Sequence, residues 1–133
     1  HRTKHCSRRI SVENNWMIIH LGQLPDPQLN PNRRLHFHAL AKAKREAKDM
    51  MIALVKQQGS PKEPYEKAHI TITWMEKHKY RRDIDNLFAS MKAYIDGLVT
   101  AGVLVDDNAD CVSYTLRYER GDKNDTVIEV NKE

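Results

Sequence analysis

Four segments of this chain carry residue patterns typical of β-strands: residues 10–21, 68–74, 111–119 and 126–130. The first is almost continuously apolar at its centre, residues 16–19, which predicts a strand covered on both faces with Trp16 in the core. In the second, the alternation places Ile70, Ile72 and Trp74 on one face, directed into the core. A short turn that contains glycine joins the last two predicted strands.

Two longer segments, residues 35–58 and 84–99, carry the period of an amphipathic helix. Gly59 closes the first as a C-terminal cap, and Gly102 ends the second. A loop with three prolines at 24–32 precedes the first helix. The order βαβαββ predicts an α+β fold of two layers, in which two helices pack on a mixed sheet of about four strands.

The chain has the size and composition of one folded domain. Its 133 residues are 30% charged, and no apolar run approaches the roughly 20 residues that a membrane helix needs. We therefore expect a single domain over residues 1–133, with residues 1–9 as a mobile basic arm. Two cysteines, Cys6 and Cys111, are too few for a disulfide framework, so we expect reduced thiols in an intracellular protein.

Charge is unevenly distributed along the chain. Residues 1–82 hold 17 Lys/Arg against 7 Asp/Glu, whereas residues 83–133 hold 5 against 11. Such a division suggests a polyanionic partner for the first part and a bound cation for the second. The alternative is a solvated surface whose charge happens to be uneven.

Four aspartates carry the candidate chemistry. Asp83 and Asp85 stand where a loop enters the second predicted helix, and Asp106 and Asp107 end the short apolar segment that follows it. Capping of the helix explains one carboxylate of the first pair, and only one of the second pair faces the first, because consecutive side chains on an extended segment point apart. Three carboxylates in one place repel one another unless cations compensate, and oxygen ligands favour Mg²⁺ or Mn²⁺. The pattern thus predicts a divalent metal site.

Lys92 follows Asp85 by seven residues, a spacing that returns to nearly the same face of a continuous helix about 10 Å farther along. An extended lysine there could reach a phosphate beside the metal. The alternative is a surface lysine paired with Asp96 at i+4.

These residues, over about 81–118, resemble the RusA family of Holliday junction resolvases, and the likeness is carried by Arg82-Asp83-Ile84-Asp85-Asn86-Leu87, Asp96-Gly97-Leu98, Ala101-Gly102 and Asp106-Asp107. The resemblance implies a small homodimeric endonuclease, encoded by bacteria or their phages and cytoplasmic. It also implies that the protein requires Mg²⁺, with Mn²⁺ as a substitute. The activity implied is paired, symmetric cleavage of four-way DNA junctions in recombination and repair.

Position by position, the resemblance makes Asp83, Asp85 and Asp107 catalytic ligands of the metal. The family's lysine follows the second aspartate by four residues, where this chain has Ala89. Lys92 preserves instead the family's spacing to Asp96, as if three residues were added after Leu87, and takes the catalytic role of that lysine.

Basic residues of the first predicted helix and of the loops are expected to bind the phosphate backbone: Arg33, Arg34, Lys42, Arg45, Lys79, Arg81 and Arg82. The alternative is that these residues form an ordinary solvated face. Two other functions remain open from sequence. One is a branched-DNA binding module that cuts nothing, and the other is a Mg²⁺ phosphohydrolase that acts on nucleotides.

Overall fold

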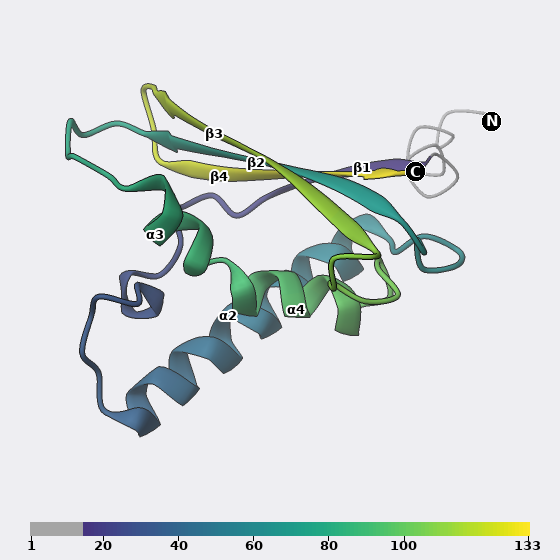
Figure 1. The fold of residues 1–133 in the computed structure, drawn as a ribbon, viewed down its shortest axis with the longest axis horizontal. Coiled ribbons are helices and arrows are strands. Elements are labelled where there is room, and N and C mark those ends of the chain that lie inside the picture. Colours follow the sequence, from purple (N-terminus) through teal and green to yellow (C-terminus); the bar gives the residue numbers. More distant parts are fainter. Residues whose placement is uncertain (1–14) are drawn as a thin grey trace.

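All helices of the described chain lie on one side of a single β-sheet (Figure 1). The structure is a computed structural model that describes residues 15–133, so the predicted basic arm and Cys6 lie outside the described residues. The strands are β1 (Trp16–His20), β2 (Ala68–Glu76), β3 (Val112–Arg120) and β4 (Asp125–Lys132). The helices are η1 (Pro27–Leu29), α2 (Phe37–Gln58), α3 (Ile84–Ala89) and α4 (Lys92–Thr100).

The sheet has the strand order β1-β4-β2-β3. β4 pairs antiparallel with both β1 and β2, whereas β2 and β3 run parallel, with Ala68 opposite Val112 and Glu76 opposite Arg120. A parallel neighbour requires a crossover, and α3 and α4 supply it. The predicted α+β fold, with helices on a mixed sheet of four strands, is confirmed.

The apolar period of the helices fixes which of their faces is buried. In α2 the stripe Ala43, Ala47, Met51 and Val55 is buried, and Gly59 ends the helix with φ of 100°, a conformation that favours glycine. Within residues 15–133, no helix is long and apolar enough to cross a membrane.

The prediction that both faces of the first strand are covered is wrong. β1 is an edge strand whose residues alternate between buried and exposed, and Trp16 and Ile18 are 40% and 37% exposed. No element described here covers the outer face of the sheet (Figure 1). A continuous apolar run therefore marked a strand without showing which of its faces would be covered.

The single helix predicted over residues 84–99 is interrupted after Ala89. Ser90 and Met91 have ψ of −9°, and the amide of Met91 donates to Phe88 O, three residues back. The Ser90 hydroxyl also donates to Asn86 O. The break lets Met91 become fully buried while Ile84, assigned by its period to the apolar stripe, stays 42% exposed.

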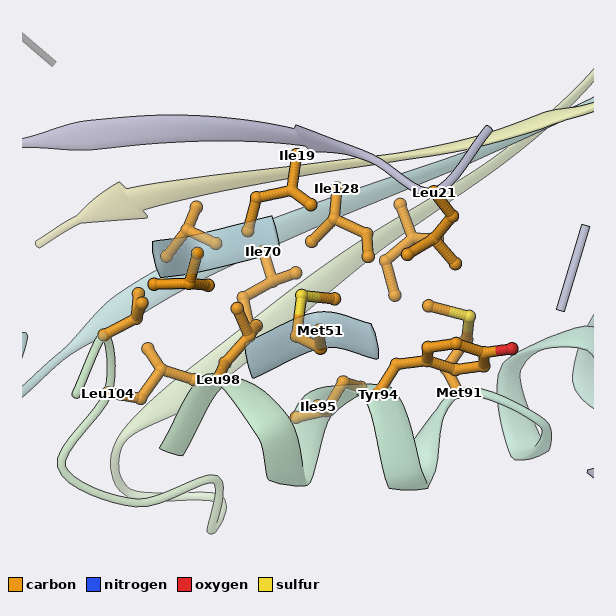
Figure 2. Close-up of a cluster of buried hydrophobic side chains, with 14 of the residues drawn as sticks. Ile19, Leu21, Met51, Ile70, Met91, Tyr94, Ile95, Leu98, Leu104 and Ile128 are labelled. Carbon is orange, nitrogen blue, oxygen red and sulfur yellow. The ribbon is translucent and has the colours of Figure 1, made fainter. Parts of the chain in front are cut away.

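The core lies between the sheet and the crossed helices. Figure 2 shows Ile19, Ile70 and Ile128 of the sheet directed toward Met51 of α2 and Leu98 of α4. The predicted inward face of β2 is confirmed, since its residues Ile70, Ile72 and Trp74 have no exposed surface. Burial of such side chains supplies the main stabilisation of the fold.

Gly97 sets the distance between α4 and α2. A Cβ at this position would lie 2.7 Å from Met51 Cβ and 2.8 Å from Lys48 O, so α2 itself would have to move. We expect Gly97→Ala to lower the free energy of unfolding by about 1–3 kcal/mol, despite alanine's higher helix propensity. Denaturant unfolding measures this loss. Gly121→Ala is the control, because its Cβ meets only Met75 Cε, at 3.4 Å; equal losses in both variants would contradict the explanation.

Candidate active site and nucleic-acid interface

Asp83 and Asp85 are exposed at the start of α3. Asp83 is the N-cap residue by position, but its side chain makes no capping hydrogen bond, and its carbonyl accepts from the amides of Asn86 and Leu87. Asp85 Oδ1 accepts from the Asn86 amide at 3.0 Å. Capping by its side chain therefore does not account for Asp83, and both carboxylates face solvent.

Lys92, the first residue of α4, joins two carboxylates. Its Nζ donates to Asp107 Oδ2 at 2.6 Å and to Asp96 Oδ1 at 2.8 Å. The alternative predicted for Lys92, pairing with Asp96, is thus present together with a contact to a residue fifteen positions away. An ammonium has three N–H donors, so one remains for a further partner.

The contact between Lys92 and Asp107 favours the charged form of both groups. Hydrogen bonding to Asp107 and then to Asp96 raises the pKa of Lys92, and hydrogen bonding from Lys92 lowers the pKa of Asp107. Tyr114 lies within the field of the same charges; burial first, and Asp107 second, raise its pKa to about 12. At neutral pH the ammonium is therefore positive and the tyrosine neutral.

The side chain of Asp106 makes different contacts from that of Asp107, as the extended geometry predicted. Its Oδ1 accepts from the amide of Asp107 at 2.7 Å, and its Oδ2 from Asn108 Nδ2 at 3.1 Å. Asn108 Oδ1 in turn accepts from the amides of Asp110 and Cys111. Asp106 braces the loop before β3, which leaves Asp107 to meet Lys92.

The structure does not bring Asp107 to Asp83 and Asp85. β2 and β3 are parallel and in register, so Asp83, which follows β2, and Asp107, which precedes β3, start from opposite ends of the two strands (Figure 1). Among residues 15–133, no group of three His, Cys, Asp or Glu side chains is placed to hold a metal ion. As placed, the three carboxylates do not form a site for Mg²⁺ or Mn²⁺, and their role as ligands stays a prediction.

The face of α2 that turns toward α4 forms a positively charged hollow of about 340 Å³, which we call the basic hollow. Its charged lining is Lys44, Arg45, Lys48, Lys92 and Asp96. Four cations against one carboxylate suit the phosphate backbone of a nucleic acid. Basic residues of α2 thus line the same hollow as Lys92 of the candidate active site.

The other predicted phosphate contacts are dispersed. Arg81 lines a second hollow, near the start of α3. The remaining four are exposed and line neither hollow: Arg33, Arg34, Lys42 and Lys79. Their contact with DNA stays a prediction.

The side chain of Arg82 forms an ion pair within the protein. Its Nε and Nη2 donate to the two oxygens of Glu76 at 2.9 and 2.6 Å, and Glu76 is 1% exposed. Tyr118 Oη donates to the same carboxylate at 2.6 Å. The hydrogen bond from Arg82 lowers the pKa of Glu76, and the guanidinium neutralises the charge of this carboxylate. The Nε–Nη2 edge of the guanidinium is therefore occupied by Glu76, which leaves Nη1 for another partner, and the predicted contact of Arg82 with a phosphate stays a prediction.

Sequence reasoning missed Glu76 and Tyr114. Glu76 ends a strand whose alternation faces the core, and a carboxylate on a buried face is a signal that a cationic partner is present. Tyr114 stands on β3 and makes an edge-to-face contact with Phe88 of α3, at 4.9 Å between ring centroids. Its place in the alternation over residues 111–119 indicated a strand, and nothing in the sequence placed it beside Lys92.

Comparison with known proteins finds no family model that matches the chain and no curated protein that matches it. The likeness to the RusA family rests on the residues quoted above.

Proposed function

We propose that this protein is a structure-selective, Mg²⁺-dependent endonuclease of the RusA kind that resolves four-way DNA junctions as a homodimer. The supporting observation is the contact between Lys92 and Asp107, at 2.6 Å, beside a hollow lined by three further cations. Two residues that the resemblance assigns to catalysis meet there, although they belong to different segments of the chain.

Within this proposal, Lys92 offsets the charge that develops on the phosphate under attack. Asp107 and Asp96 hold its ammonium in place, and the third N–H is free for a phosphate oxygen. Lys44, Arg45 and Lys48 bind the adjoining backbone and give affinity without sequence information. Binding is therefore expected to weaken steeply with added salt.

A second function is favoured by one observation. Asp83 and Asp85 lie apart from Asp107, and no three-ligand metal site is present among residues 15–133. A module that binds branched DNA and cuts nothing needs the basic hollow but not the carboxylates.

Cleavage of a synthetic four-way junction over a Mg²⁺ titration separates the two functions. If the protein is an endonuclease, cutting appears with Mg²⁺, stops with a chelator, and falls at least a hundredfold in Asp83→Asn and Asp107→Asn while junction binding is retained. Asp110→Asn, in the same loop as Asp107 but outside the Lys92 contact, is the control and keeps its activity.

Undiminished cutting by both variants would refute the assignment of these carboxylates. Binding without cutting at any Mg²⁺ concentration would establish the binding module instead. Failure to bind DNA at low salt, combined with Mg²⁺-dependent release of phosphate from nucleotides, would favour a nucleotide phosphohydrolase.

A further inference from the structure

A second hollow, of about 390 Å³, lies between the loop at 24–30 and the start of α3. We call it the amide hollow, because three carboxamide side chains line it: Asn30, Asn86 and Asn124. The rest of the lining is partly apolar, with Pro25, Pro27 and Leu87 among it, and partly polar or charged: Arg81, Arg82, Asp83 and Ser90. A volume of this size, lined by polar and apolar groups together, is within the range of sites for small organic ligands.

The walls of the amide hollow are fixed by hydrogen bonds from elsewhere in the protein. The amide of Asp26 donates to Tyr94 Oη at 3.0 Å, and Thr126 Oγ1 donates to Gln23 O at 2.8 Å, so the loop is tied to α4 and β4. On the opposite side, Asn124 Oδ1 accepts from the amide of Lys77 at 2.8 Å. The hollow is therefore formed before any ligand arrives.

These hydrogen bonds also fix which atoms of the carboxamides are free. Asn30 Oδ1 accepts from the amide of Asn32 at 2.9 Å, and Asn124 Oδ1 is bound to Lys77. Within residues 15–133, neither Nδ2 group has a partner, and the side chain of Asn86 makes no hydrogen bond. The free polar groups thus include donors, the two Nδ2 groups and the guanidinium of Arg81, and acceptors, the carboxamide oxygen of Asn86 and the carboxylate of Asp83.

The amide hollow and the basic hollow lie on either side of Ser90, which lines both. A DNA backbone held by Lys48 and Lys92 in the basic hollow would leave a neighbouring nucleotide within reach of the amide hollow. Prolines and leucine offer an apolar surface to the faces of a base, and hydrogen-bond donors meet acceptors on its edge.

We propose that the amide hollow binds one unstacked nucleobase of the DNA that lies in the basic hollow. A lining that offers both donors and acceptors suits guanine, which carries the acceptors O6 and N7 and the N2 amino donor. This inference rests on the proposed function, because it requires that the protein bind DNA. It adds a source of sequence preference to a surface that otherwise contacts only phosphates.

Nuclear magnetic resonance of ¹⁵N-labelled protein tests the inference without any cleavage. The probes are two single-stranded pentanucleotides, one with a central guanine and one with an abasic site in its place. We expect the side-chain NH₂ signals of Asn30 and Asn124 to shift with the first probe and not with the second. The backbone amides of Lys44 and Lys48 shift with both, because they report binding of the phosphates.

Asn30→Asp and Asn124→Asp remove the donor but keep the oxygen that closes each turn. Each is expected to reduce the preference for the guanine probe over the abasic probe about tenfold. Asn131→Asp is the control for the added charge; it lies on an exposed position of β4 and leaves the preference unchanged.

Two results would overturn the inference, and they differ from failure of the proposed function. If the asparagine signals respond equally to both probes, or if both variants keep the full preference, the hollow binds no base. If neither probe moves any signal, including those of Lys44 and Lys48, the protein does not bind DNA and both proposals fail.

Discussion

Under the proposed function, Lys92→Met is expected to lower the rate of junction cleavage by about 10²–10³-fold and to leave the dissociation constant for the junction nearly unchanged. Methionine keeps the length of the side chain and removes the ammonium that Asp107 and Asp96 hold. Binding persists because Lys44, Arg45 and Lys48 still line the basic hollow. Single-turnover cleavage and an electrophoretic binding assay, both on the same four-way junction, measure the two quantities.

Asp96→Asn is the matched control for Lys92→Met. It weakens one contact of the ammonium and keeps the other, at 2.6 Å from Asp107, so cleavage is expected to fall less than tenfold. Because the pKa of Lys92 is raised from its ordinary value of 10.5, we expect that deprotonation of this residue does not limit the proposed cleavage at neutral pH. A Lys92→Met protein that cuts at the wild-type rate would show that the ammonium has no part in the reaction.

Arg82→Ala is expected to lower the free energy of unfolding by about 2–4 kcal/mol. Glu76 is 1% exposed and would keep only Tyr118 as a partner, so a buried carboxylate would lose its counter-charge. The partial exposure of Arg82 lets water enter after its removal, and we therefore place the loss below the upper limit for a buried pair. Urea unfolding at neutral pH measures the change.

Arg81→Ala is the control for this variant, since the neighbouring arginine makes no ion pair among residues 15–133. Its stability is expected to stay within about 0.5 kcal/mol of the wild type. Replacement of both partners, in Glu76→Met with Arg82→Met, removes the unpaired charge and should recover most of the loss. If Arg82→Ala and the double variant are equally unstable, loss of packing and not unpaired charge is the cause.

The same pair predicts a dependence on pH. The folded-state pKa of Glu76 is lowered from its ordinary value of 4.5, chiefly by the hydrogen bond from Arg82. The wild type therefore has this stabilisation above pH 4.5 and loses it as the pH falls through the lowered pKa. In Arg82→Ala the lowering of this pKa by Arg82 is lost, so the difference in stability between the two proteins should narrow in acid.

The sequence determined the elements and the fold class. Periods of two and of 3.6 residues mark the buried faces of β2 and α2, and burial of these faces places helices on one side of a four-stranded sheet. The same patterns named the positions that carry chemistry, and they separated Asp106 from Asp107, because alternation along an extended segment is a local property.

Tertiary structure alone decided which of these groups meet. Ser90 breaks the helix on which the predicted alignment of Asp85 and Lys92 depended, and no periodicity argument holds across such a break. Because β2 and β3 are parallel, Asp83 follows one end of the strand pair and Asp107 precedes the other end. Because Glu76 is buried, it needs a cationic partner, and Arg82 forms that ion pair. Contacts of this kind join residues from separate segments through the packing of the whole chain, so the local pattern of side chains does not encode them.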